Sequence, residues 1–164
     1  MRNSAKRPLT GLRDLQPILM LAPMLSAAMF WGVWTLSAPE AQAAIVTDRE
    51  RASFTLCGEG PRINCIVDGD TLYYQGVKIR IADIDTPETN PPRCAQEASL
   101  GKAATQRLLQ LANAAPFTLQ GIDRDEDRYG RKLRVLTRGG QSLGRVLVDE
   151  GLARWYQGGR RPWC

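Results

Sequence analysis

The sequence predicts a mainly β domain: a five-stranded barrel with one helix between strands 3 and 4 and a second, C-terminal helix. Five short segments alternate apolar and polar residues, which is typical of half-buried strands. Two longer segments instead repeat apolar residues at helical spacing. Because a flat antiparallel sheet of five short strands would leave open edges, we expect the strands to roll into a barrel.

The first three strands are expected at residues 66–67, 71–74 and 77–82, and a turn separates each from the next. Gln75 and Gly76 form the tighter of the two turns, typical of a two-residue hairpin. Residues 86–92 contain three prolines and cannot continue regular structure.

The second half of the domain begins with a helix predicted at about residues 95–112. Its apolar stripe is expected to pack in the core and consists of Leu100, Ala104, Leu108 and Leu111. Two strands follow, at residues 117–122 and 132–138, joined by a charged turn. Ser142 can cap a last helix through Glu150, which buries Leu143, Val146 and Leu147. This order of elements is that of an OB-fold.

The first 43 residues differ in composition from this domain. Residues 15–39 carry no charge, follow a basic segment, and precede the small-residue motif Ala-Gln-Ala at 41–43. These features indicate a cleaved signal peptide, but the apolar run is also long enough to be a retained membrane anchor. We therefore expect a secreted or periplasmic protein, or one anchored to the inner membrane, with a lead-in linker at 44–56 and the folded domain at 57–164.

Charge and composition restrict the chemistry more than the class of partner. Without residues 1–43, 18 basic and 15 acidic residues remain, a bias compatible with a polyanionic partner or with an ordinary solvated surface. The chain has no histidine, so a catalytic proton transfer would use Asp, Glu, Lys or Tyr. A catalytic metal would be a hard, oxygen-liganded ion such as calcium or magnesium.

Three polar clusters fall at the ends of the predicted strands. They are Asp-Gly-Asp-Thr at 68–71, Arg80 with Asp-Thr-Pro-Glu at 85–88, and Asp-Arg-Tyr-Gly-Arg at 127–131. Each cluster alone is compatible with an ordinary polar turn. Together they supply the carboxylates and arginines that hydrolysis of a phosphodiester requires.

In this order and at these spacings, the three clusters resemble the thermonuclease (staphylococcal nuclease-like) family. The resemblance covers residues 65–154. It implies an endonuclease that cleaves DNA and RNA, prefers single-stranded regions and leaves 3′-phosphates. It also implies a single calcium ion as cofactor, and we expect a monomer that meets a membrane only if its N-terminal segment is retained.

The resemblance also implies a role for each matching residue. Asp70 and Asp85 would bind calcium through their carboxylates and Thr86 through its backbone carbonyl. Arg80 and Arg131 would bind the scissile phosphate, and Glu88 would orient or deprotonate the attacking water. Tyr129 would lie beside the nucleotide.

Some features do not follow from the family pattern. Arg80 and Asp85 are five residues apart and would point to opposite faces of an ideal strand. For both to reach one site, the strand must end or bulge near Asp83. Asp83 itself has no assigned role. The loop at 89–94 is shorter than in the best-known members, and Tyr156 or Trp155 only approximates their later pair of tyrosines. The alternative function is a non-catalytic OB-fold module of the cell envelope that binds nucleic acid.

Four cysteines lie in the mature part of the chain. In an exported protein an even number favours two disulfides. A zinc site is the rival interpretation, but the sequence has neither a C-x-x-C pair nor a histidine. Of the three pairings we expect Cys57–Cys65, across a short Gly-Pro turn, and Cys94–Cys164, which would hold the C-terminal tail near the site.

Overall fold

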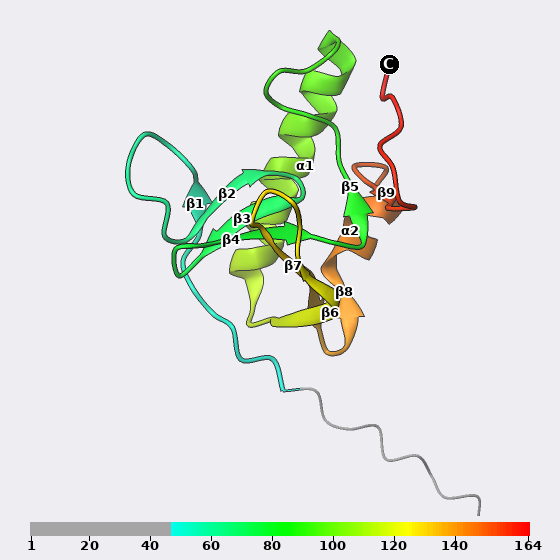
Figure 1. The fold of residues 1–164 in the computed structure, drawn as a ribbon. Helices are drawn as coiled ribbons and strands as arrows, with labels where there is room; N and C mark the ends of the chain where they lie inside the picture. The colour runs from blue at the N-terminus through cyan, green and yellow to red at the C-terminus, as the bar shows by residue number, and fades with distance from the viewer. Residues whose placement is uncertain (1–46) are drawn as a thin grey trace, which may run out of the picture. The chain divides into compact units, whose positions relative to one another are not determined.

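The computed structural model describes residues 47–164 (Figure 1). The predicted signal peptide or anchor at residues 1–43 lies outside this range. Within residues 47–164, no helix has the length and apolar character needed to cross a membrane. In chain order the elements are β1 (Thr55–Leu56), β2 (Cys65–Asp68), β3 (Thr71–Tyr74), β4 (Val77–Ile81), β5 (Ile84–Asp85), α1 (Ala95–Ala114), β6 (Thr118–Glu126), β7 (Lys132–Arg138), β8 (Gln141–Ser142), α2 (Leu143–Asp149) and β9 (Arg154–Trp155).

The main sheet has the strand order β1-β2-β3-β4-β7-β6, and β8 also pairs with β7. The order from β2 to β6 is consistent with an OB-fold. Strand β7 runs parallel to β4, whereas the pairings β2–β3, β3–β4 and β6–β7 are antiparallel. The chain leaves β4, passes through α1 and β6, and returns in the same direction. Among the described residues no strand pairing joins β6 back to β2, so the backbone ladders do not close a five-stranded barrel.

The segment before residue 57 covers part of the gap between β2 and β6. Glu50 forms an antiparallel bridge with Phe117, directly before β6, and β1 runs parallel to β2. Phe54 is buried between these contacts, with its ring centroid 6.1 Å from that of Tyr74 and 6.0 Å from that of Phe117. The backbone of Phe54 also exchanges two hydrogen bonds with the side-chain amide of Asn113 in α1. Residues 50–56 therefore belong to the packed domain.

The β3–β4 hairpin brings the first two polar clusters together. Gln75 and Gly76 have φ values of 51° and 81°, as a tight turn with two left-handed residues requires. The resulting register places Thr71 opposite Arg80. The turn after β2 therefore lies beside the end of β4.

The helices form close to where the sequence predicts them. The side chain of Cys94 caps α1 by accepting a hydrogen bond from the Glu97 N–H, and Ser142 caps α2 in the same way through Arg145. Leu108 and Leu147 are fully buried, whereas Leu100 and Val146 are only partly so. Helix α1 packs against β2, and α2 packs against β7, β5 and β9 (Figure 1).

Strand β2 is one residue longer at each end than predicted, and β6 extends further. Strand β6 continues to Glu126, through residues expected to belong to the charged turn. Its residues from Gln120 onward are exposed, and residues 123–126 are all charged, so no apolar alternation marks them as a strand.

Candidate active site

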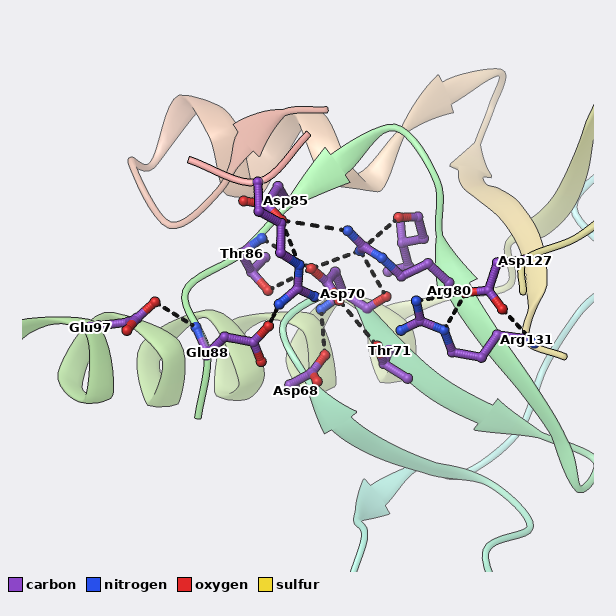
Figure 2. Close-up of polar contacts among 12 residues, drawn as sticks. Asp68, Asp70, Thr71, Arg80, Asp85, Thr86, Glu88, Glu97, Asp127 and Arg131 are labelled. Atoms are coloured by element: carbon purple, nitrogen blue, oxygen red, sulfur yellow. Dashed lines mark hydrogen bonds and ion pairs between the residues drawn. The ribbon is translucent and has the colours of Figure 1, made fainter. Parts of the chain in front are cut away.

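Asp70 lies at the centre of the site and is 2 % exposed. Its Oδ2 accepts hydrogen bonds from the backbone N–H and the hydroxyl of Thr86, both at 3.0 Å, and lies 2.7 Å from Nη1 of Arg80 (Figure 2). Its Oδ1 accepts a hydrogen bond from the Thr71 hydroxyl at 3.1 Å. The turn after β2, the end of β4 and the start of the proline-containing segment at 86–92, here called the proline loop, therefore meet at one carboxylate.

Gly69 allows this turn to approach α1. A Cβ at this position would lie 2.6 Å from Cβ of Ala104 and 2.9 Å from Cγ2 of Thr86. Only a residue without a side chain fits between the helix and the proline loop.

Arg80 is a buried arginine held in one orientation. Its Nη1 also donates to the carbonyls of Ile81 at 3.0 Å and of Asp70 at 3.4 Å, and its Nη2 lies 3.7 Å from Oδ1 of Asp85. Strand β4 ends at Ile81 and β5 starts at Ile84, so the backbone bends between Arg80 and Asp85. The predicted break near Asp83 is confirmed.

Asp83 attaches this bend to α2. The hydroxyl of Ser142, which caps α2, donates to Oδ2 of Asp83 at 2.5 Å. The carbonyl of Asp83 accepts a hydrogen bond from the Tyr156 N–H at 2.9 Å. These contacts fix the direction in which β5 leaves the bend, and they give Asp83 the positioning role that the sequence does not reveal.

The buried carboxylates repel one another. Burial, and then the charge of Asp70, raise the pKa of Asp68 to about 6. The same two causes raise the pKa of Asp85, while the charges of Arg160 and Arg80 act in the opposite direction. The Oδ1 atom of Asp85 is buried and accepts no hydrogen bond within residues 47–164. A cation beside Asp70 and Asp85 would offset this repulsion.

The donor set of the site fits a hard cation. Asp70 and Asp85 offer carboxylate oxygens, and Thr86, whose N–H donates to Asp70, has a backbone carbonyl that could serve as a further ligand. No group of three or more Asp, Glu, His or Cys side chains with metal-binding geometry occurs in the described part of the chain. Calcium accepts backbone carbonyls and water alongside carboxylates, so two aspartates and one carbonyl are compatible with it.

Glu88 lies on the proline loop and forms an ion pair with Arg160. The loop is attached to α1 by Glu97, which is 2 % exposed. The carboxylate of Glu97 accepts hydrogen bonds from the backbone N–H of Arg93 at 2.6 Å and of Glu88 at 3.5 Å. Sequence reasoning missed Glu97, although a glutamate at the third position of a helix is the usual partner in a capping box.

Arg131 is oriented by Asp127 (Figure 2). Asp127 also accepts a hydrogen bond from the backbone N–H of Tyr129, which fixes the turn between β6 and β7. Tyr129 is 67 % exposed, and the centroid of its ring lies 5.5 Å from Cζ of Arg131 and 4.8 Å from Cζ of Arg128. The third cluster thus presents an oriented arginine beside an exposed aromatic ring.

A cavity of about 890 Å³ is lined by Arg80 and by the third cluster. Its charged lining is almost entirely basic and consists of Lys78, Arg80, Arg124, Arg128, Arg131 and Arg160, with Asp127 as the one acid. Tyr129 and Tyr156 also line it, whereas Trp155 does not. Asp70, Asp85 and Glu88 are not among the lining residues but contact arginines that are. Such a surface suits a polyanion with flat, stackable groups.

Both expected disulfides are present, Cys57–Cys65 and Cys94–Cys164. The second joins the start of α1 to the end of the tail. As expected, the tail lies next to the site, but only one of its two arginines, Arg160, lines the cavity.

Known proteins with similar sequences are named as nucleases, which agrees with a cavity suited to a polyanion. A family model described as "Staphylococcal nuclease homologue" matches residues 78–162. Endonuclease YncB of Bacillus subtilis is 38 % identical over 94 residues, which are 54 % of this chain and 44 % of the relative. A thermonuclease of Staphylococcus intermedius is 29 % identical over 109 residues, 64 % of each chain. A micrococcal nuclease of Shigella flexneri is 33 % identical over 105 residues, 56 % of this chain and 55 % of the relative. The chain thus spans less than two thirds of the length of each relative.

Proposed function

Because this chain belongs to the staphylococcal nuclease family, we propose that it is an exported nuclease that hydrolyses phosphodiester bonds in DNA and RNA. The observation that carries the proposal is the meeting of Asp70 and Asp85 with Arg80, next to a cavity lined by cations. Buried carboxylates and oriented arginines at one place are what phosphoryl chemistry needs.

The proposed cofactor is one calcium ion. Asp70, Asp85 and the backbone carbonyl of Thr86 would hold it, and it would supply positive charge that polarises the phosphate. The support is the pair of buried carboxylates, the unsatisfied Oδ1 of Asp85 and the oxygen-only donor set.

Arg80 and Arg131 are the proposed phosphate ligands. Both line the cavity, and each is held by an aspartate before substrate arrives. Guanidinium groups that are already oriented stabilise the charge that develops as water attacks phosphorus, because no side chain has to reorganise during the step. Tyr129 lies beside Arg131 and would contact the nucleotide.

Glu88 is the proposed water-orienting residue and general base. Water attacks phosphorus and gives one proton to Glu88, and the bond from phosphorus to the 5′ oxygen breaks as that oxygen takes a proton from solvent water. The products would be a 3′-phosphate and a 5′-hydroxyl that has gained a proton. The backbone N–H groups of Glu88 and Arg93 donate to the buried carboxylate of Glu97, which holds the proline loop and with it Glu88.

Substrate recognition would rest on phosphate rather than on base edges. The charged groups that line the cavity are arginines and one lysine, apart from the paired Asp127. Contacts of this kind do not distinguish deoxyribose from ribose, which supports action on both DNA and RNA.

The proposal of export rests on the cysteines and on the N-terminal sequence. All cysteines of the chain are in disulfides, which persist in oxidising compartments. We propose a secreted or periplasmic monomer, with residues 15–39 as its membrane anchor if residues 1–43 are not removed.

The test is to incubate the purified protein with single-stranded DNA and with RNA, in calcium, in zinc or in excess chelator. We expect cleavage in calcium, less in zinc and none in chelator. Full activity in chelator would rule out the cofactor. Binding without cleavage under all conditions would instead favour the alternative, a non-catalytic nucleic-acid-binding module.

A further inference from the structure

The C-terminal tail brings a further arginine to the site. We infer that Arg160 binds a phosphate group of the substrate that flanks the scissile one, and that the Cys94–Cys164 disulfide keeps it in place. The inference rests on the proposed nuclease function, and it adds a substrate-binding residue from outside the three motif clusters.

Arg160 contacts the carboxylates of Asp85 and Glu88 and also lines the cavity. Its Nε lies 3.6 Å from Oδ1 of Asp85, its Nη1 pairs with Glu88, and the residue lines the cavity together with Arg80 and Arg131. Within residues 47–164, none of its ion pairs uses Nη2. A guanidinium group has five N–H donors in a planar fork, so Arg160 can bind a phosphate while it still contacts Glu88.

The exposure of Arg160 assigns it to a flanking phosphate. Its side chain is 45 % exposed, whereas that of Arg80 is 8 % exposed and bonded to two backbone carbonyls. A buried, fixed arginine suits the transition state, because its orientation is set before the reaction. A solvated arginine at the edge contributes mainly to binding of the ground state, which depends on salt.

The tail has few means of holding this position without a covalent bond. Residues 157–162 contain glycines, arginines and a proline, and all of them are exposed. Their ordering costs conformational entropy that burial does not offset. Beyond the disulfide and the ion pairs of Arg160 itself, the tail is held by Arg154. The Cζ of Arg154 lies 3.7 Å from the centroid of the Trp163 ring, and its Nη1 donates to the Pro162 carbonyl at 3.0 Å. The disulfide joins this short tail to the N-cap of α1.

The test compares Arg160→Ala with Arg161→Ala, a change of the same charge on the same tail at a residue that does not line the cavity. The probe is a dye-labelled single-stranded oligothymidylate, titrated in chelator so that it is not cleaved. We expect Arg160→Ala to weaken binding roughly 10-fold or more at low salt, the usual effect of one charge-assisted contact. The slope of log affinity against log salt should fall by about 0.7. Arg161→Ala should change neither quantity, and Arg160→Lys should restore the slope.

In calcium, the same variants separate binding from chemistry. Arg160→Ala should raise KM by a factor similar to its loss of affinity, because a flanking contact acts on the ground state and the transition state alike. Its effect on kcat, through the lost pair with Glu88, should be smaller than that of Arg131→Ala. A large fall in kcat at unchanged KM would overturn the assignment to a flanking phosphate. Tighter binding by Arg160→Ala would overturn it too, because Arg160 would then obstruct the site.

The role of the disulfide is tested by replacing Cys94 and Cys164 together with serine, which keeps a good N-cap on α1. This variant should lose as much affinity for the oligothymidylate as Arg160→Ala does. Adding Arg160→Ala to it should cost nothing further, because both changes remove one contact. Full affinity in the serine variant would refute the tether. If the wild-type protein cleaves in calcium but Arg160→Ala behaves as wild type, this inference fails alone; if the wild-type protein binds and never cleaves, the proposed function fails instead.

Discussion

Arg131 and Asp127 form an ion pair with two contacts, in which Nε and Nη2 of the arginine each lie 2.7 Å from Oδ2 of the aspartate. The other carboxylate oxygen accepts hydrogen bonds from the backbone N–H groups of Arg131, at 3.0 Å, and of Tyr129, at 2.9 Å. Burial acts to raise the pKa of Asp127, but the bonds from Arg131 and Tyr129 outweigh it and hold the pKa below its ordinary value. Asp127 therefore stays ionised at neutral pH and keeps the guanidinium directed into the cavity.

Asp127→Ala should reduce kcat, because it releases the guanidinium of Arg131 from its fixed orientation. Arg131→Ala and Arg80→Ala should each cost about 10²–10³-fold, the usual effect of removing one preoriented donor. The double variant Asp127→Ala/Arg131→Ala should be no slower than Arg131→Ala alone, since Asp127 acts through Arg131. Single-turnover cleavage of DNA measures all four variants. Asp125→Ala is the matched control, because its salt bridges to Lys132 and Arg134 are on the surface. A double variant much slower than Arg131→Ala would mean that Asp127 has a role of its own.

Glu88→Gln should lower kcat roughly 10²–10⁴-fold, the usual contribution of a positioned acid–base group. The amide keeps the size of the side chain but cannot accept a proton from water. Turnover at saturating calcium is the measurement, with Glu126→Gln as the control, since Glu126 is half-exposed on β6 and pairs with Lys132. Turnover close to that of the wild type would exclude Glu88 as a base.

Asp85→Asn should raise the calcium concentration needed for half-maximal cleavage while the fold remains stable. The carboxylate of Asp85 accepts no hydrogen bond at Oδ1, and its nearest arginine nitrogens are 3.6 and 3.7 Å away. Few native contacts are therefore lost when its charge is removed. Calorimetric titration with calcium and thermal unfolding in chelator separate the two effects. Unchanged calcium affinity would remove Asp85 from the proposed ligands.

Gly69→Ala should destabilise the protein by about 1–3 kcal/mol, the usual cost of overpacking. The new methyl group would press on Ala104 in α1 and on Thr86, and one of these segments must move. Because Asp70 is the next residue, calcium affinity should fall as well. Gly60→Ala serves as the control, since a Cβ there would meet nothing within 4 Å. Urea unfolding gives the comparison, and equal stability of the two variants would contradict the close approach.

The two disulfides should differ in their contribution to stability. They close loops with sequence separations of 8 and 70 residues. In the chain-entropy model such loops contribute about 2.5 and about 4.5 kcal/mol, as upper estimates. Cys164→Ser should therefore lower the free energy of unfolding more than Cys57→Ser does. Urea unfolding of both variants tests this order, and non-reducing peptide mapping tests the pairing itself: a Cys57–Cys94 peptide would contradict it.

The sequence alone determined the features that depend on neighbouring residues. Strand β7 spans residues 132–138 as expected, Gln75 and Gly76 form the expected hairpin turn, and Ser142 caps α2. Each of these follows from local backbone preferences or from the alternation of apolar residues, which act over a few positions. The interruption of the strand near Asp83 was predictable for a similar reason, because side chains alternate along a strand.

Only the tertiary structure decided which distant residues support the site. Ser142 donates to Asp83 from 59 residues away, Glu97 holds the loop of Glu88 from α1, and Arg160 reaches the carboxylates from the tail. Phe54 enters the core from a segment that resembles a linker by composition. None of these contacts leaves a periodic pattern in the sequence, because each depends on how separate elements pack around one another. The sequence does not show whether the partner of a charged side chain is water or a buried carboxylate. Packing determines which of the two the side chain contacts.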